Sequence, residues 1–307
     1  MATFNTDNFT EGQGLSLDQE MKAIGVTETP VLSYILALGN TKKATGRIHS
    51  WITRELDNTD SSAKPEGENP LSNFVTSQRK QLNSPLEIFS KGTSISRTAD
   101  DIENSAFARE IADRLVELKR EMNRKLILGT ANDGSNGAPR TMKGLMSYLQ
   151  AANTVEATSL TEAAIKSGLK VLYDNGTNTG TNIVGICNID TKEMVDAIYE
   201  NKFSYTKNVD VSFGANAFGM RLDTLQSNYA GSVRFLVDRN MPDGTIVFAN
   251  ADYLSAAFLR QPTYFELART GDVSRTGYIV SEFTLQLDAA EAVSQVKIAS
   301  GARTASK

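Results

Sequence analysis

The chain has 307 residues, of which 40% are hydrophobic and 22% are charged, with a formal net charge of −4 and a pI of about 5.3. This length allows one or two domains with a sizeable core. The acidic net charge argues against a protein whose main task is to bind nucleic acid, because such binding relies on clustered Lys and Arg. No apolar run approaches the roughly 20 residues of a membrane helix, and the N-terminus lacks the basic start and apolar stretch of a signal peptide, so we expect a cytosolic product without a membrane partner.

Reactive side chains are scarce. The chain holds a single histidine, His49, and a single cysteine, Cys187. One residue of each type cannot supply a His-ligated metal cluster or an internal disulfide. We expect His49 to be an interface or core residue and Cys187 to be a small buried apolar residue. Acidic runs lack EF-hand spacing and Gly-rich runs lack the spacing of phosphate-binding loops. The sequence therefore predicts no catalytic residue, no cofactor and no metal, and it argues against an enzyme.

The first segment, residues 1–40, is predicted to be an arm. Its polar beginning has too little apolar surface to fold alone, so it must lie on something else or be mobile. It ends in a short apolar anchor, "TPVLSYILALGN", which stops at Gly39-Asn40.

Residues 47–98 are predicted to form a long two-stranded excursion. The run "RIHSWITREL" favours a strand with Ile52 on one face and Trp51 on the other. The polar stretch 57–70 contains two prolines and favours an exposed loop tip, after which residues 72–96 return as an extended segment. Because an isolated hairpin is only marginally stable in water, we expect it to pack on another subunit or domain.

A long helix is predicted over residues 101–128. Asp100 and Asp101 suit its N-terminus. At 1.5 Å per residue it would span about 40 Å, which makes it a rigid spine with one face on its own domain and a charged flank for neighbours. Its apolar stripe has helical spacing and consists of Phe107, Ile111, Leu115, Leu118, Met122 and Leu126.

The following hundred residues have an alternating helix and strand character. Thr161 is predicted to cap a helix that stops at Asn175-Gly176, and "NIVGICNI" is predicted to be a buried strand. A second helix, "DTKEMVDAIYEN", would point Met194 and Ile198 inward. The runs "SVRFLVD" and "TIVFA" enclose "RNMPDG", which predicts a hairpin. Near the C-terminus "TGYIVSEFTLQLD" alternates as a strand does.

The order of these elements, and four stretches within it, resemble the tailed-phage major capsid proteins with the Hong Kong ninety-seven fold. The stretches are "TPVLSYILALGNTKKATGRIHSWITREL", with its T-P anchor and Trp; "KPEGENP", with its E-G element; "QRKQLNSPLEIFSKGTSISRT"; and "ELARTGDVSRTGYIVSEFTLQL", with its L-A-x-T-G-D ending. One departure is Glu87, which stands where Gln is common in that family. The resemblance covers most of residues 29–290.

The resemblance implies an α+β fold divided as in that family. The parts would be an N-terminal arm, an extended loop with its tip, a peripheral domain with its spine helix, an axial domain, and late strands that return to the peripheral domain. Their ranges would be 1–40, 41–98 with the tip at 57–70, 99–144 with the helix at 101–128, 145–255, and 256–307.

The resemblance also implies a function without catalysis. Such a protein would assemble in the host cytoplasm into hexamers and pentamers that build the icosahedral head around double-stranded DNA, without sequence-specific DNA binding. A separate scaffolding protein and a portal would be its partners. Some relatives crosslink subunits through Lys and Asn; Lys64 and Lys91 lie in the extended loop, but no catalytic partner is identifiable, so we expect non-covalent assembly. The predicted subunit contacts are Trp51, Lys64, Glu66, Glu68, Arg79, Lys80, Arg114, Arg120 and Arg124.

Two other functions stay open from the sequence. One is another virion assembly protein, such as a tail or decoration subunit. The other is a cytosolic α/β ligand-binding protein or enzyme, which would form a concave polar pocket within residues 145–255.

Overall fold

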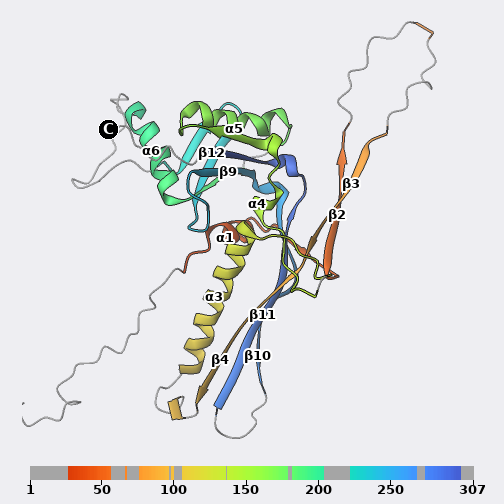
Figure 1. The fold of residues 1–307 in the computed structure, drawn as a ribbon, viewed down its shortest axis with the longest axis vertical. Coiled ribbons are helices and arrows are strands. Elements are labelled where there is room, and N and C mark those ends of the chain that lie inside the picture. The colour runs from red at the N-terminus through yellow and green to blue at the C-terminus, as the bar shows by residue number, and fades with distance from the viewer. Residues whose placement is uncertain are drawn as a thin grey trace, which may run out of the picture.

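A computed structural model describes most of the chain between residues 27 and 298 (Figure 1). The described residues are 27–56, 66–67, 76–96, 98–99, 106–135, 137–178, 182–203, 222–267 and 274–298. The predictions for residues 1–26 and for nearly all of the tip at 57–70 lie outside them.

The helices are α1 (Pro30–Ala37), α3 (Ala106–Leu128), α4 (Leu145–Tyr148), α5 (Glu162–Asp174) and α6 (Ile189–Phe203), with short 3-10 turns η3 (Ala151–Asn153), η4 (Ala251–Tyr253) and η5 (Ala290–Ala292). The strands are β1 (Thr41–Lys43), β2 (Ile48–Glu55), β3 (Gln78–Pro85), β4 (Glu87–Ser96), β5 (Thr154–Ala157), β6 (Ile183–Cys187), β7 (Thr224–Ser227), β8 (Gly231–Val237), β9 (Thr245–Asn250), β10 (Leu254–Glu266), β11 (Ser274–Leu287) and β12 (Val293–Ile298).

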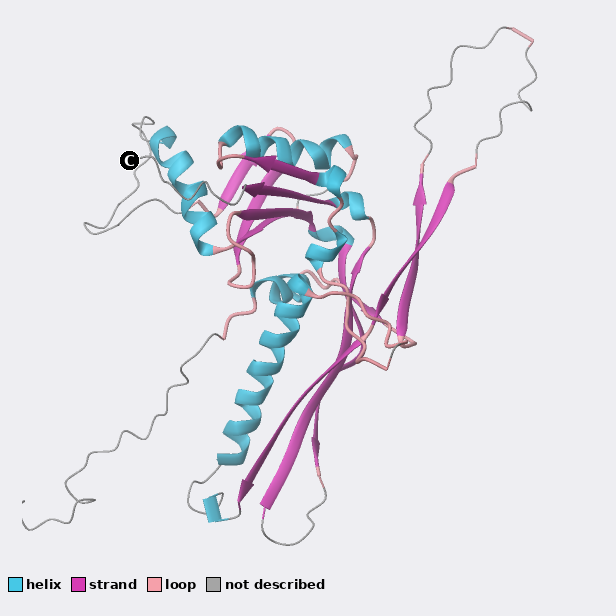
Figure 2. Cartoon of the chain, in the orientation of Figure 1, coloured by secondary structure: helices cyan, strands magenta, loops and turns pink. Residues whose placement is uncertain are grey.

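Within the described residues, these strands form two sheets and a separate hairpin (Figure 2). The order β1-β10-β11-β4 makes a sheet of four strands, called here the long sheet. The order β5-β12-β9-β6-β8-β7 makes a sheet of six strands, called here the compact sheet. Strands β2 and β3 pair only with each other and form the hairpin that projects from the body.

The predicted spine helix is confirmed over α3, which runs along the long sheet and ends at Leu128 (Figure 1). Its predicted start at Asp100 or Asp101 lies outside the described residues. Leu118 and Met122 are fully buried against Phe89 of β4 and Phe283 of β11. The apolar stripe therefore does what its spacing predicts: it covers one face of a sheet with a continuous apolar core.

The compact sheet is built around β6, whose residues are all buried. Ile183 and Cys187 face a core that also contains α5 and α6 residues, whereas Val184 and Ile186 belong to the core shared with α1 and α3. Alternate residues of this strand therefore serve two cores, as the two faces of a central strand must. Cys187 is a buried free thiol, as predicted, and burial raises its pKa to about 12.

Helix α5 confirms its predicted limits. The Thr161 hydroxyl accepts a hydrogen bond from the Ala164 N–H, and Gly176 follows the helix with a φ of 67°. A positive φ carries no steric penalty in glycine, which explains why the helix stops there.

The predicted hairpin between residues 232–238 and 245–249 is wrong. Strands β8 and β9 do not pair with each other, because β6 lies between them, parallel to β8 and antiparallel to β9. The Pro-Asp-Gly turn is present, but the connection carries the chain past one strand instead of to its neighbour. The residues of a turn specify where the chain bends but not which strands pair. The fully buried strand β6 lies between β8 and β9 in the compact sheet.

Of the two residues predicted to point inward on α6, Ile198 is partly buried against the core beside the compact sheet, as predicted, but the prediction for Met194 is wrong. Met194 is 41% exposed, whereas Val195 and Tyr199 are buried against the compact sheet. Tyr199 supplies the larger apolar surface, so the helix turns that side to the core.

Two strands lie elsewhere than the predicted division places them. Residues 47–98 do not form one excursion, since the hairpin ends at Pro85 and β4 pairs with β11 in the long sheet. Phe89 of β4 explains this, because it fills the core beneath α3. Strand β12, expected with the late strands of the long sheet, pairs with β5 and β9 in the compact sheet.

Candidate functional site

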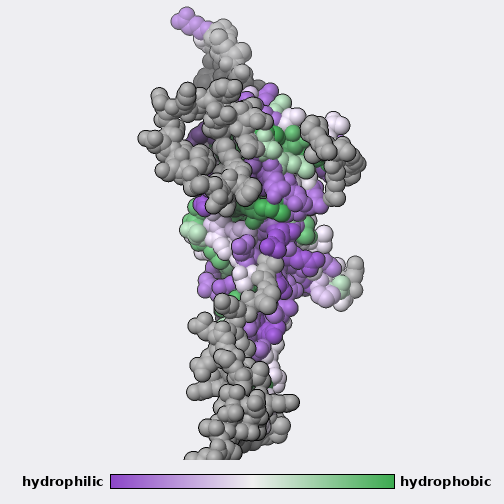
Figure 3. All heavy atoms as spheres, turned by 90° about the vertical axis from the view of Figure 1, so that its left-hand side faces the viewer, coloured by the Kyte–Doolittle hydropathy of each residue, from purple (hydrophilic) through white to green (hydrophobic). Residues whose placement is uncertain are grey.

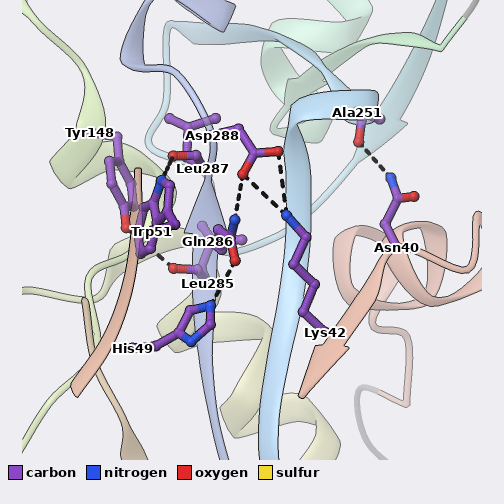
Figure 4. Close-up of polar contacts among 10 residues, drawn as sticks. All are labelled: Asn40, Lys42, His49, Trp51, Tyr148, Ala251, Leu285, Gln286, Leu287 and Asp288. Atoms are coloured by element: carbon purple, nitrogen blue, oxygen red, sulfur yellow. Dashed lines mark hydrogen bonds and ion pairs between the residues drawn. The ribbon is translucent and has the colours of Figure 1, made fainter. Parts of the chain in front are cut away.

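The hairpin of β2 and β3 is tied to the body at its base by residues that lie far away in the sequence (Figure 4). The Trp51 indole Nε1–H donates to the Leu287 carbonyl oxygen at 3.1 Å. The hydroxyls of Ser84 and Thr284 lie 2.8 Å apart, both buried. Both bonds end on β11, so the last residues of this strand pair with β10 in the long sheet and also hold the hairpin.

A chain of polar side chains continues this anchor (Figure 4). His49 Nε2 lies 2.7 Å from Gln286 Oε1, and Gln286 Nε2 donates to Asp288 Oδ1 at 2.5 Å. Lys42 Nζ donates to the same carboxylate at 3.2 Å. Because the Gln286 amide oxygen only accepts, His49 donates from Nε2. The single histidine is thus a part of the hairpin base, within the core or interface role that we predict.

The loop between α3 and α4 closes the anchor from the other side. Arg140 donates to the Arg47 carbonyl and forms an ion pair with Glu282 at 3.1 Å. The Tyr148 hydroxyl donates to the Leu285 carbonyl at 3.2 Å, and burial raises the Tyr148 pKa to about 12. The hairpin base is therefore rigid and buried on several sides.

Glu87, the departure noted in the sequence, lies at the same junction. Its Oε2 accepts the Met142 N–H at 2.9 Å, and its Oε1 pairs with Lys125 of α3 at 3.2 Å. A carboxylate can therefore serve a position where an amide is common, because the spine helix supplies a cation.

Beyond its base, the hairpin carries large apolar side chains that the described residues leave exposed. Ile52 is 69% exposed and Leu56 is 68% exposed. Arg54 lies directly opposite Arg79 in the register. Like charges in this position repel each other, and large exposed apolar side chains are unusual on a protruding ribbon. Both features suit a surface that is covered by another molecule.

A groove of about 550 Å³ lies between the hairpin and the compact sheet, and Arg54 and Leu56 of the hairpin are among its lining residues. Its walls come from the hairpin, the C-terminal end of α5 and the segment before β12. The lining residues include Thr53, Lys80, Leu82, Asp174, Asn175 and Glu291. Mixed charges and an open shape do not resemble a small-molecule pocket, which is concave and mostly apolar.

The predicted contact residues are distributed over two separate regions. Trp51 is 8% exposed and acts as a base anchor, whereas Arg79, Lys80 and Glu66 are exposed on the hairpin. Lys64 and Glu68 lie outside the described residues. Figure 1 shows the hairpin pointing away from α3, so the structure does not bring the hairpin residues to the spine-helix residues of the same chain.

On α3, the three predicted arginines differ. Arg114 holds two carboxylates of its own helix, with Glu117 at 2.7 Å and Glu110 at 3.2 Å. Hydrogen bonds to Glu110 and then Glu117 raise the Arg114 pKa. Arg120 and Arg124 are exposed. The space-filling view shows hydrophilic side chains over much of the described surface on this side of the molecule (Figure 3).

Sequence reasoning missed the polar residues of the anchor. Thr284 and Gln286 occupy the strand positions that alternation assigns to solvent, but the hairpin base buries them. Ser84, Asp288 and Lys42 carry no local signal either. Only long-range pairing reveals them.

Within the described part of the chain, His, Cys, Asp and Glu side chains form no group that could hold a metal ion. The helices there are too short or too polar to cross a membrane.

Comparison with solved structures identifies the fold. The capsid of a native GTA particle aligns with a TM-score of 0.66 at 15% identity, covering 97% of this chain and 100% of that one. The capsid of cyanophage A-1(L) aligns with a TM-score of 0.69 at 12% identity, covering 93% and 97%. The SrpI encapsulin of Synechococcus elongatus PCC 7942 aligns with a TM-score of 0.65 at 8% identity, covering 100% and 99%. These identities show the fold alone, which is the predicted Hong Kong ninety-seven fold.

The chain matches no curated relative. A family model described as SU10 major capsid protein matches residues 2–299, which is nearly the whole chain. This match agrees with the α+β fold and with the capsids that share it. The chain belongs to the SU10 major capsid protein family and is a capsid protein of a phage-type virion shell.

Proposed function

We propose that this subunit assembles into hexamers and pentamers that close into an icosahedral head around double-stranded DNA. The observation that carries the proposal is the hairpin, which is anchored rigidly at its base yet exposes Ile52 and Leu56 beyond it. A single chain gains nothing from holding apolar side chains in water. Repeated head-to-tail contacts between identical subunits close into rings, and such contacts need an element that reaches out of its own subunit.

The hairpin of one subunit would lie on the neighbouring subunit. The tip carries Glu66 and Glu68, and the spine helix of a neighbour offers exposed Arg120 and Arg124, with Arg114 partly engaged by its own helix. Lys64, Arg79 and Lys80 would complete this contact, and Trp51, predicted as a contact residue, would act through the hairpin base that it holds. Opposite charges at such a contact select the partner and its register more than they add affinity.

The proposed division of labour follows the family. The hairpin and the part of the N-terminal arm (1–40) that precedes α1 would cross subunit boundaries, since α1 belongs to the core of its own subunit. The long sheet with α3 would form the peripheral domain, and residues 145–255 would supply most of the axial domain. Assembly would take place in the host cytoplasm with a separate scaffolding protein and a portal, and DNA would be packaged without sequence-specific contacts. The acidic chain supports this last point, because tight phosphate binding would hinder the entry of DNA.

Sedimentation velocity of the purified subunit, followed by electron microscopy of any fast fraction, tests the proposal. We expect rings, tubes or shells, whereas a monomer or dimer at all salt concentrations, also with a co-expressed scaffolding protein, would contradict it. Deleting residues 57–70 should leave the subunit folded and abolish shells. Normal shells from this deletion would exclude the hairpin contact.

The charge contact has its own test. Glu66→Arg with Glu68→Arg should prevent shells, and Arg120→Glu with Arg124→Glu in the same chain should restore them. Lys170→Gln, an exposed change on α5, is the control and should assemble normally. Shells that tolerate the first pair of changes would remove these residues from the interface.

A further inference from the structure

Asn123 is a buried polar residue in the middle of an apolar junction. It lies on α3 and is 1% exposed. Its neighbours on the helix, Met122 and Leu126, belong to a core that also contains Val184 and Val247 of the compact sheet. The spine helix and the compact sheet thus meet through apolar side chains with one amide among them.

The Asn123 amide connects three elements. Its Oδ1 accepts the Leu32 N–H of α1 at 3.0 Å. Its Nδ2 donates to Asp238 Oδ2, just after β8, at 2.6 Å. The other oxygen of Asp238 accepts the N–H and the Nδ2 of Asn240. Since the Leu32 N–H can only donate, the orientation of the amide is determined by its partners.

The physical roles of the core and the amide differ. Apolar contacts are non-directional, so they hold two elements together without specifying one angle between them. A buried amide is satisfied at one relative position and leaves costly unpaired groups at others. A single buried Asn is known to specify the register of packed helices in this way.

We propose that the Asn123–Asp238 hydrogen bond sets the orientation of the compact sheet relative to the spine helix, and that it thereby determines the curvature of the shell. The second half rests on the proposed function. In a shell, each subunit contacts its neighbours through both parts, so a change of angle within the subunit repeats at every position and changes the closure of the particle. Leu32 links α1, which lies within the N-terminal arm (1–40), to the same bond.

An exchange of the two side chains tests the proposal. Asn123→Asp removes the amide donor and places two carboxylates at hydrogen-bond distance, which repel each other while both are ionised at pH 8 and are bridged by one shared proton at pH 5. In Asn123→Asp with Asp238→Asn, the new carboxylate at position 123 accepts from Leu32 and from the amide at position 238, whose oxygen still serves Asn240. The double variant therefore keeps the bond with donor and acceptor reversed. Asn228→Asp, an exposed change of the same kind, is the control.

The angle is measured directly with spin labels at Ser90→Cys of β4 and Lys170→Cys of α5, which are both exposed, while the native Cys187 is buried. At pH 8, Asn123→Asp should broaden or shift the distance distribution, and at pH 5 the shared proton should narrow it again. The double variant and Asn228→Asp should match the parent at both pH values. An unchanged distribution in folded Asn123→Asp at pH 8, or a double variant that folds but stays broad, would overturn the proposal.

Electron microscopy tests the consequence for the shell. Asn123→Asp should give particles of several diameters or open sheets, and the double variant should recover one diameter. If Asn123→Asp changes the distance distribution and still gives particles of uniform parental size, the link to curvature is wrong. If the parent chain forms no particles, the proposed function fails, whereas the spin-label result still decides the role of the bond.

Discussion

Trp51 and Leu287 lie 236 positions apart, and the indole N–H of the first donates to the carbonyl of the second at 3.1 Å. This bond joins the hairpin to the end of β11, next to the bond of His49 (Figure 4). Ser84 of the hairpin adds a bond to Thr284 of the same strand. The conspicuous tryptophan of the sequence thus anchors the hairpin base, and the exposed residues beyond it are free to meet another subunit.

Trp51→Phe should loosen the hairpin without unfolding the subunit. Phenylalanine keeps much of the apolar burial and loses the hydrogen bond, which costs about 1–2 kcal/mol, including the unpaired carbonyl of Leu287. Hydrogen exchange across residues 48–55 should become faster, as measured by mass spectrometry of peptic fragments. Ile52→Ala, on the exposed face, should leave stability within about 0.5 kcal/mol of the parent. Unchanged hydrogen exchange in Trp51→Phe would show that the bonds of His49 and Ser84 hold the hairpin base without the indole bond.

Glu87→Gln should destabilise the subunit by about 1 kcal/mol, because it keeps an acceptor for the Met142 N–H and loses the ion pair with Lys125. Glu87→Ala removes both and should cost more. Denaturant unfolding measures the difference. The control is Glu121→Gln, which breaks the more exposed pair with Lys91 and should change stability by less than about 0.5 kcal/mol. An equal loss of unfolding free energy in Glu87→Gln and Glu121→Gln would contradict the expectation that the more buried ion pair contributes more.

Tyr148 should make the fold sensitive to alkaline pH. Burial raises its pKa from 10.0 to about 12, so the folded state keeps the phenol proton at a pH where the unfolded state releases it. Its contribution to stability is complete below pH 10 and is lost as the pH rises toward 12. Tyr148→Phe should lower stability at pH 7 by about 1 kcal/mol through the lost bond to Leu285, and should flatten the decline above pH 10. Parallel pH profiles of the two proteins would exclude this role.

Gly168→Ala should disturb the packing of α5 on the compact sheet. A Cβ at this position would lie 2.5 Å from Val296 Cγ2 and 3.2 Å from the Phe248 ring. Overpacking of this kind costs about 1–3 kcal/mol, more than alanine gains from its helix propensity. Ser167→Ala, exposed on the same helix, should be neutral or slightly stabilising. Thermal unfolding separates the two, and equal midpoints would show that the helix moves away without cost.

Local patterns in the sequence determined the elements that depend on short-range periodicity. The apolar stripe from Phe107 to Leu126 predicts α3, Thr161 and Gly176 limit α5, and the continuous apolar run around Cys187 predicts β6. The ordered motifs, from the T-P anchor to the late strand, led to the fold family. Each of these signals lies within a few turns or one strand, where residue spacing and backbone conformation are directly coupled.

Only the tertiary structure decided which strands pair and which polar residues are buried. Strand β6 lies between β8 and β9. Strand β4 pairs with β11 in the long sheet instead of extending the hairpin, because its Phe89 is buried in the core beneath α3. Gln286 alternates as a surface residue would, but it is buried against His49 of a strand more than two hundred residues earlier. Strand pairing and the satisfaction of buried polar groups depend on which distant surfaces meet, and no local pattern carries that information.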